Sequence, residues 1–512
     1  MGKKKKGTIK TVASISVMIV FFKILSFFRQ TVTAYYFGAT TQTDSYYVAY
    51  GFIMGIISGA VSALTISTIA VYTKIRILEG INEASRLINS LIEISFPVLL
   101  GIVLVIIVFA PGIAKILAPG YDEEQLAVVS NYIRVLAPSL LILSVQFTMS
   151  SVLDSNKSFF APRMETFAYN IAAIIACLFF SKAYGIKSLL IAQLIAAFSF
   201  SLFLIFSASK YHRIFLTGVK NVRGLKEAVI TMLPLLISNS VVQINEMVDK
   251  AITSSLGNGA TSSLYYSQTL HQFVIGVLIT SVTNVMITDF SEMVAKNQIS
   301  DIRERLSKAN NFLICVLLAI SVVVVFGAKD IVKIVYFRGS FSEEAVELTS
   351  RSLIGYSLGF GIIAVNAMLS TTLYAFRKTK KTLISCVVSI MVNCLLSIVL
   401  SRFWGIIGVT IGTCISSAVG LLINYLFLRK HINDYPIKYH IITLLKCLPF
   451  AGLLSIFCWL IEKYFLGPSI FKFVIFIVGI LFYLFALKIV HISEIEGIMR
   501  NLTNSIRNRN KK

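Results

Sequence analysis

Charged side chains inside long apolar stretches are the residues of this chain best placed to do chemistry. A charge within a membrane helix is costly, and it usually faces a cavity or a partner of opposite charge. The charged residues in such positions are Lys23, Arg29, Asp44, Glu246, Asp249 and Lys250. Their placement predicts a polar cavity inside a membrane protein.

The cations of this set favour the binding of an anion. Lysine and arginine donate charge-assisted hydrogen bonds, which suit a pyrophosphate. Lys23 and Arg29 are separated by roughly 120° around one helix, so their side chains need not lie on the same narrow face of that helix. We predict that Lys23, Arg29, Asp44 and Lys250 bind the polar head of an amphipathic anion. Asp44, near a helix start, could instead be a helix cap.

Two further residues could hold a coupling ion. Asp249 is an acid in the middle of a helix, and Asn393 is an amide in a later helix. A hard cation such as sodium prefers oxygen ligands of this kind. Asp249 could equally form an ion pair with its neighbour Lys250. No resident metal or other cofactor is expected, because the seven cysteines form no CxxC or Cys/His cluster.

No catalytic motif accompanies these charges. The sequence contains no GxxxxGK nucleotide loop and no GxSxG or HExxH pattern. We therefore predict that the chain is not an enzyme and that transport uses an ion gradient, of sodium or protons, or the membrane potential.

The elements that position these residues are membrane helices. The chain has 512 residues, of which 56% are hydrophobic and 14% charged, whereas soluble proteins carry about 25% charged residues. Runs of about twenty apolar residues predict an all-α polytopic membrane protein. The fourteen predicted helices lie within 11–34, 45–70, 89–114, 127–153, 164–181, 186–207, 229–255, 262–291, 309–328, 346–376, 382–401, 406–428, 441–461 and 470–490.

The basic residues predict an orientation. The net charge of +23 needs no nucleic-acid partner, because basic residues in short cytoplasmic loops orient membrane proteins. With the N-terminus inside, the loop lysines and arginines favour the inner side roughly three to one. We predict a multi-pass protein of the cytoplasmic (inner) membrane, with both termini cytoplasmic and no cleaved signal peptide.

A weak internal repeat divides the predicted helices. Matching features recur at a shift of 219 or 220 residues, among them Gly38 with Gly257 and Gly120 with Gly339. Six helices in each repeat give parallel repeats related by an axis along the membrane normal. The predicted parts are an N-lobe (1–220), a C-lobe (221–435), two further helices (436–492) and a basic cytoplasmic tail (493–512).

Several stretches resemble one known family. Residues 22–44 read FKILSFFRQTVTAYYFGATTQTD, and they are followed by GAVSAL at 59–64, LAPGY at 117–121, SSLGNGATSSLYY at 254–266 and RGSFSEEAVELT at 338–349. In this order the chain resembles the MurJ (MviN) lipid II flippases of the multidrug/oligosaccharidyl-lipid/polysaccharide exporter superfamily. The resemblance implies a fourteen-helix fold with two lobes around a V-shaped central cavity.

The resemblance also implies a function and a substrate. It implies alternating-access transport of undecaprenyl-pyrophosphate-linked peptidoglycan precursor, lipid II, from the inner to the outer leaflet. The chain departs from the family pattern at three positions: Gln30 replaces an acid, Thr269 replaces a helix-8 arginine and Gln272 replaces a glutamate. In addition, a helix-2 arginine of the pattern has no match in this chain. These departures predict relaxed or altered glycan preference.

Three other functions remain open at this stage. A flippase for another lipid-linked envelope polysaccharide is favoured by the missing arginines. A multidrug or cation antiporter of the same superfamily would need acidic and aromatic cavity residues in place of Lys23 and Arg29. An envelope polymerase or ligase is disfavoured by the short outer loops. The expected partners are the lipid-linked glycan and membrane lipids, and we expect a monomer.

Overall fold

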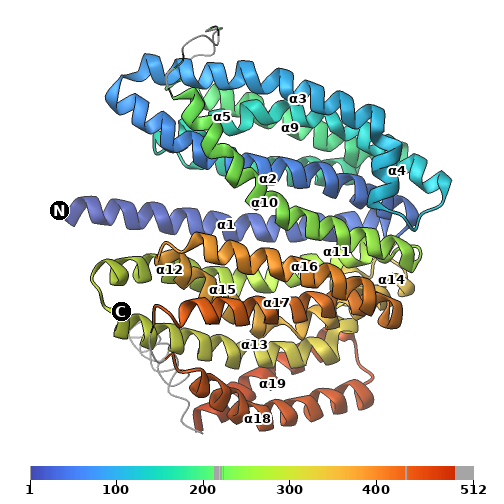
Figure 1. The fold of residues 1–512 in the computed structure, drawn as a ribbon. Coiled ribbons are helices and arrows are strands. Elements are labelled where there is room, and N and C mark those ends of the chain that lie inside the picture. Colours follow the sequence, from blue (N-terminus) through green and yellow to red (C-terminus); the bar gives the residue numbers. More distant parts are fainter. Residues whose placement is uncertain (1, 213–217, 219–221, 223, 433–434, 490–512) are drawn as a thin grey trace, which may run out of the picture. The chain divides into compact units, whose positions relative to one another are not determined.

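The computed structural model describes residues 2–212, 218, 222, 224–432 and 435–489 (Figure 1). The described part is built of helices and contains no strand. The helices are α1 (Gly2–Phe37), α2 (Thr41–Leu78), α3 (Ile81–Leu117), α4 (Glu123–Leu136), α5 (Leu143–Ser155), α6 (Phe160–Arg163), α7 (Glu165–Ile175), α8 (Ser181–Tyr184), α9 (Lys187–Ala208), α10 (Leu225–Thr253), α11 (Ala260–Val274), α12 (Thr280–Ala295), α13 (Ile299–Tyr336), α14 (Glu343–Ser357), α15 (Phe360–Ala375), α16 (Thr379–Trp404), α17 (Ile406–Leu428), α18 (Ile437–Tyr464) and α19 (Ser469–Ile489). Short 3₁₀ segments η1 (Ala137–Ile142) and η3 (Ser254–Leu256) and π segments η2 (Ala176–Phe180) and η4 (Ile275–Ile279) join some of them.

The length and composition of these helices confirm an all-α polytopic membrane protein. Eleven helical stretches among the described residues are long and apolar enough to cross a membrane. The pair α14 and α15, bent by 49° at its break, would make a twelfth. Helices suit this environment because they satisfy their own backbone hydrogen bonds in lipid. The helices α1 and α10 lie outside that count, so fourteen spans remain a prediction.

The chain forms two compact units. The first unit comprises Met1–Tyr265 and Gly339–Phe341, and the second comprises Tyr266–Arg338 and Ser342–Lys512. This division places α10 with the helices that precede it. The predicted lobe boundaries at 220 and 435 remain predictions. The predicted basic tail at 493–512 lies outside the described residues.

In the first unit, a row of glycines on α2 brings α10 close. Gly51, Gly55 and Gly59 repeat every four residues, so they lie on one helix face. Side chains of α10 fill the space above them: Gly55 lies under Gln243, and Gly51 lies under Lys250. Small residues at this spacing allow close helix packing in membranes. The stripe therefore fixes the polar face of α10 against α2.

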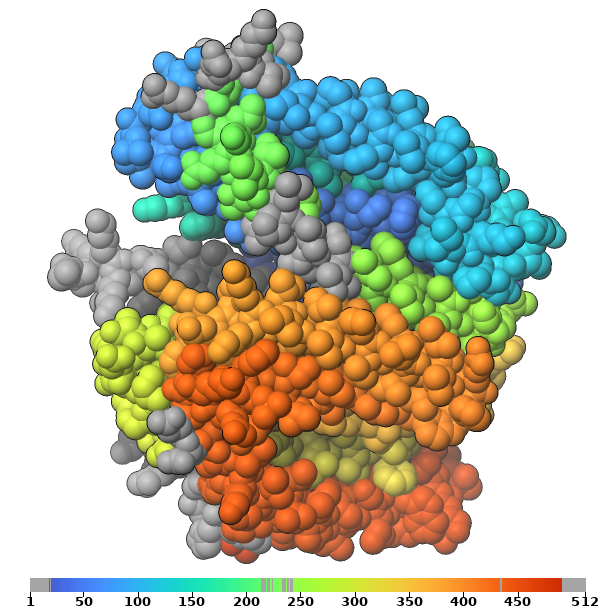
Figure 2. Space-filling model, viewed as in Figure 1, coloured from blue at the N-terminus to red at the C-terminus, as the bar shows by residue number. Residues whose placement is uncertain are grey.

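In the second unit, the last two helices pack against α13. Their buried contact includes Cys315 and Cys447, whose sulfur atoms lie 3.3 Å apart, together with Phe476 and Tyr483. Figure 1 shows α18 and α19 side by side next to α13. In the space-filling view α16 and α17 cover one face of this unit, and a hollow between α17 and α18 reveals α13 (Figure 2).

Local backbone geometry recurs at the shift of the sequence repeat. Lys157 and Arg377 each end a helix in the left-handed conformation, with φ of 62° and 58°. In both turns the following N–H donates back to a helix carbonyl over 2.9 Å, which is the hydrogen bond of a Schellman cap. Gly185 and Gly405, with φ of 55° and 59°, form a second matching pair. This recurrence supports the repeat, while superposable lobes remain a prediction.

Candidate functional site

Arg29 is buried among tyrosines in the first unit. Its residue is 8% exposed, and its guanidinium donates a hydrogen bond to the Tyr50 hydroxyl. Tyr46 stacks on Tyr50 with ring centroids 5.4 Å apart, and Tyr47 stacks on Tyr265 at 4.0 Å. We call Tyr46, Tyr47, Tyr50 and Tyr265 the tyrosine cluster. The Tyr50 hydroxyl accepts from the guanidinium, and among the described residues no carboxylate forms an ion pair with Arg29, which leaves the positive charge able to attract an anion.

Lys250 reaches the same cluster from α10. Its ammonium nitrogen lies 6.0 Å from the centroid of the Tyr265 ring, within cation–π range, and the residue is 6% exposed. Any side chain at Gly51 would collide with this ammonium group, so the glycine makes room for it. Glu246 and Asp249 act electrostatically on Lys250. The structure thus brings two predicted cations, Arg29 and Lys250, to one group of aromatic rings.

Gln30, which the sequence singled out only as a departure from the family pattern, is also a member of this site. Its amide nitrogen donates to the Tyr47 hydroxyl over 2.5 Å, and the side chain is fully buried. An amide orients the tyrosine without adding a negative charge beside Arg29. The replacement of an acid by Gln30 therefore leaves the site more cationic.

Lys23 lines a separate, polar cavity of about 700 Å³ in the first unit. The charged residues around it also include Asp154, Arg163 and Glu165. Arg163 Nη1 contacts both carboxylate oxygens of Asp154, at 2.6 and 2.8 Å. Glu165 acts electrostatically on Tyr50, so the cavity adjoins the tyrosine cluster. The rest of the wall consists of six hydroxyl side chains and five apolar ones: Ser26, Ser58, Ser62, Thr65, Ser150 and Thr166, with Phe22, Val61, Ile66, Ile69 and Pro162.

Asp44 lies at the start of another helix. Its carboxylate accepts hydrogen bonds from the Gly259 N–H at 2.6 Å and from the Ser262 N–H at 2.7 Å. These amides belong to the first turn of α11, so Asp44 caps that helix from α2. A carboxylate is stabilising there, because the free N–H groups and the helix dipole are both positive. Asp44 is thus a helix cap, but of α11 and not of its own helix α2, whose N-cap is Thr40. A role in substrate binding remains a prediction.

Close backbone contacts between loops surround this cap. At each contact a glycine faces a neighbouring backbone so closely that a Cβ atom would collide with it. The pairs are Gly38 with Ser340, Gly339 with Tyr35, Gly120 with Ser255 and Gly259 with Ala39. The repeat relates Gly120 to Gly339, and the same shift takes Ser255 to Tyr36, next to Tyr35, so the second and third contacts correspond to each other.

The two predicted coupling-ion residues lie in different compact units. Asp249 is buried in α10 of the first unit, and Asn393 is buried in α16 of the second. The Asn393 amide donates to the Thr413 hydroxyl over 3.0 Å. Among the described residues, no group of three or more histidine, cysteine or acidic side chains could hold a metal ion. A shared ion site of Asp249 and Asn393 remains a prediction.

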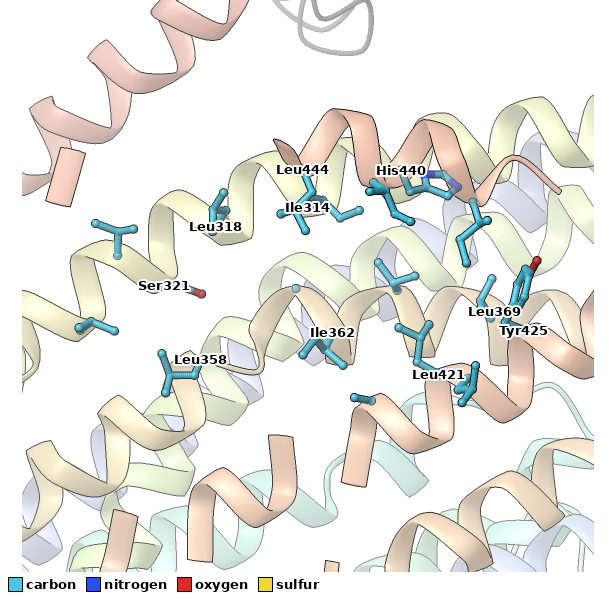
Figure 3. Close-up of a pocket in the computed structure, with 18 of the residues that line it drawn as sticks. Ile314, Leu318, Ser321, Leu358, Ile362, Leu369, Leu421, Tyr425, His440 and Leu444 are labelled. Atoms are coloured by element: carbon cyan, nitrogen blue, oxygen red, sulfur yellow. The ribbon is translucent and has the colours of Figure 1, made fainter. Parts of the chain in front are cut away.

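The second unit contains a groove of a different character. Its volume is about 590 Å³, and its wall is mostly aliphatic, with residues from α13, α15, α17 and α18. Figure 3 shows Leu318, Ile362 and Leu421 along it, with Tyr425 and His440 at one end. We call it the apolar groove. Such a surface fits a hydrocarbon chain.

Comparison with known proteins identifies the family. The family model described as lipid II flippase MurJ matches residues 33–479. The chain belongs to the lipid II flippase MurJ family. The match includes Asp44, Asp249, Lys250 and Asn393, and it begins after Lys23 and Arg29.

Individual MurJ proteins are similar over most of their length. A probable lipid II flippase MurJ of Buchnera aphidicola subsp. Schizaphis graminum is 26% identical over 81% of this chain and 82% of its own. One from Thermotoga maritima is 23% identical over 96% and 99%. A solved lipid II flippase MurJ in an inward closed conformation has a TM-score of 0.80, 23% identity and coverage of 93% and 99%.

A more distant structural relative shares the fold alone. An inward-facing multidrug resistance MATE transporter of the MOP superfamily has a TM-score of 0.65 at 14% identity, covering 82% of this chain and 98% of its own. Both structural matches agree with the helical fold expected from the sequence.

Proposed function

We propose that the chain moves a polyprenyl-pyrophosphate-linked glycan, in the first instance lipid II, from the inner to the outer leaflet by alternating access. Membership of the MurJ family supports the substrate class. The observation that carries the proposal is the placement of Arg29 and Lys250 around one tyrosine cluster inside a membrane protein. Glu246 and Asp249 act electrostatically on Lys250, whereas Arg29 forms no ion pair among the described residues, so Arg29 is the cation that an anion from outside the chain would neutralise.

The head of the substrate suits the first unit. A pyrophosphate carries about two negative charges, and several kcal/mol would oppose its burial without counter-charges. Arg29 and Lys250 supply such charges at the tyrosine cluster, and Lys23 supplies a third in the adjoining cavity. The hydroxyl-rich cavity wall suits a glycan, because sugar hydroxyls exchange hydrogen bonds with serine and threonine.

The tail of the substrate suits the second unit. The apolar groove offers about 590 Å³ lined mainly by leucine, isoleucine and valine. Burial of apolar surface contributes about 25 cal/mol per Å², so an undecaprenyl chain would gain binding free energy there. In this proposal one unit binds the charged head and the other binds the hydrocarbon tail.

A second substrate is favoured by one feature of the sequence. Thr269 and Gln272 stand where the family pattern has a charged pair, so the head group is held by fewer cations than in the pattern. We propose relaxed or altered glycan preference, with another lipid-linked envelope polysaccharide as the alternative cargo. A cation antiporter fits less well, because the tyrosine cluster already contains two cations.

The driving force is proposed to be an ion gradient or the membrane potential. Moving one charge across the membrane is worth about 2.3 kcal/mol per 100 mV, so a cationic empty carrier would respond to the potential. Asp249, with Asn393, is the proposed site of a coupling cation such as sodium. Transport that is unaffected by Asp249→Asn, or by both ion gradients and potential, would exclude this site.

The remaining features of the proposal follow from the sequence. We propose a non-enzymatic monomer in the bacterial cytoplasmic membrane with both termini cytoplasmic. The asymmetry of loop lysines and arginines supports this orientation.

The test is rescue of a bacterial strain depleted of its own lipid II flippase. Growth with normal cell shape is expected when this chain is expressed. Failure despite good membrane insertion would move the assignment to another envelope glycan. Purified protein that moved no polyprenyl-linked glycan in liposomes, but exported small organic cations, would overturn the proposed substrate class.

A further inference from the structure

The polar cavity of the first unit carries charges that a pyrophosphate does not explain. Of its four charged residues, Arg163 and Asp154 neutralise each other through two short contacts. Lys23 and Glu165 are the other two. Lys23 comes from α1 and Glu165 from the start of α7, so the cavity wall carries one positive and one negative group on different helices.

Glu165 has no cation of its own in the described part of the chain. The described ion pairs of this region join Asp154 to Arg163, and none includes Glu165. Glu165 acts electrostatically on the hydroxyls of Tyr50 and Tyr169. A carboxylate beside a site for an anion weakens that site by repulsion, unless the ligand brings a positive charge to it.

The surroundings of Glu165 suit an ammonium group. A carboxylate with tyrosines beside it provides both an ion-pair partner and aromatic rings for a cation. The cavity, at about 700 Å³, has room for a group of amino-acid size. A proton alone would need no such space and no hydroxyl-lined wall.

We propose that this cavity is a specificity site for a zwitterionic part of the cargo, with Glu165 binding an ammonium group and Lys23 an anionic group. The inference rests on the proposed function, because the cargo must be a lipid-linked glycan whose polar part carries an amine, such as an amine on an attached peptide. The Asp154–Arg163 pair lines the same cavity without adding net charge.

The test compares two probes with the purified full-length chain in lipid nanodiscs. One probe is lipid II with a free amine on its peptide, and the other is the same molecule with that amine acetylated. The native chain is expected to bind the free-amine probe about tenfold more tightly or better, the scale of one charge-assisted hydrogen bond. In the Glu165→Gln variant, the ratio of the affinities for the free-amine and the acetylated probe should be close to one. This variant should still bind the acetylated probe.

Two further variants complete the design. Glu165→Asp keeps the carboxylate, and it should restore much of the preference. Glu344→Gln changes an exposed glutamate in the first turn of α14, and it should keep the native ratio. A Glu165→Gln protein that keeps the preference would overturn the inference, as would a native chain without any preference. If Glu165→Gln alters only the pH dependence of transport, Glu165 binds a proton and the inference is also wrong. If the native chain binds neither probe, the proposed function itself fails.

Discussion

The polar cavity of the first unit and the apolar groove of the second differ in nearly every chemical respect. The cavity is lined by four charged residues and six hydroxyls, and it adjoins a cluster of tyrosines around Arg29 and Lys250. The groove is larger in aliphatic surface and carries few polar groups, with Tyr425 and His440 at one end and Ser321 toward the other. The two regions have similar volumes, so the difference lies in chemistry and not in size.

This contrast indicates how an amphipathic substrate can be bound. A single site for head and tail would have to place hydrocarbon beside charges that need polar partners. Two separate regions avoid that cost. Substitutions in one region should then affect the head or the tail of the substrate, and not both.

The largest effect is expected from Arg29→Ala. Losing a hydrogen bond from a charged group to the head of the substrate costs about 1.5–3 kcal/mol, so transport should fall by about ten- to a hundredfold. Rescue of a flippase-depleted strain measures the loss, and a membrane-insertion assay verifies that the protein is present. The control is Arg134→Ala, an exposed arginine that donates to the Ile107 carbonyl in the same unit. Full activity of the Arg29 variant would remove the cationic site from the account.

The next effect tests the groove. Gly361 lines it, and a Cβ atom there would meet no neighbour within 4 Å. Gly361→Leu should therefore fill the groove without disturbing the helix, and it should weaken binding of the full lipid by about tenfold through lost burial of the tail. The matched control is Gly452→Leu, since Gly452 in α18 also faces open space but does not line the groove. Equal binding by both variants would argue against a tail in the groove.

A smaller effect concerns the cap on α11. Asp44→Ala removes two charge-assisted hydrogen bonds between separate segments, so unfolding free energy should fall by about 2 kcal/mol. Asp122 caps its own helix, α4, through one bond to the Gln125 N–H at 2.8 Å. Asp122→Ala should cost about 1 kcal/mol. Chemical unfolding in detergent measures the stability of both variants. The transport rate of the Asp44 variant per folded molecule then separates a loss of the cap from a loss of substrate binding. An Asp44 variant no less stable than the Asp122 variant would contradict the cap.

The smallest effect separates pH dependence of the fold from that of the sites. His212 follows α9, and its Nε2 lies 3.1 Å from the Asn89 side-chain oxygen. Burial lowers the pKa of this imidazole from 6.5 to about 4. As pH falls, His212 is therefore protonated in the unfolded chain before it is protonated in the folded one. The free energy of unfolding declines between pH 6.5 and 4 by at most about 3 kcal/mol. His212→Gln, which keeps a donor but does not titrate, should lose this part of the decline. Identical pH curves for both proteins would refute the assignment.

The sequence predicted the class of fold because that signal is repeated along the whole chain. Apolar runs identify membrane helices without any knowledge of packing. Lys23, Arg29 and Lys250 could be selected because a charge in such a run is rare. The turns at Lys157 and Arg377, matched by sequence at a shift of 220, also share one backbone conformation.

Other parts of the site had weaker signals or none. The tyrosine cluster is assembled from α2 and α11, and tyrosines are common in this chain, so spacing alone could not select four of them. Glu165 was not selected from the sequence, because its cavity depends on helices that are distant in the chain, among them α1, α2 and α5. The glycine stripe at Gly51, Gly55 and Gly59 was visible as a four-residue repeat and would have predicted the contact of α2 with another helix.

The division of head and tail between the two regions is tested most directly by a crossed binding experiment. The ligands are a short-chain pyrophosphate-linked sugar, which lacks the long tail, and a long polyprenyl alcohol, which lacks the head. Arg29→Ala should abolish binding of the first and leave the second unchanged, whereas Gly361→Leu should weaken the second and leave the first unchanged. If either variant lowers the affinity for both ligands equally in folded protein, the head and the tail are not bound by separate regions and the account is wrong.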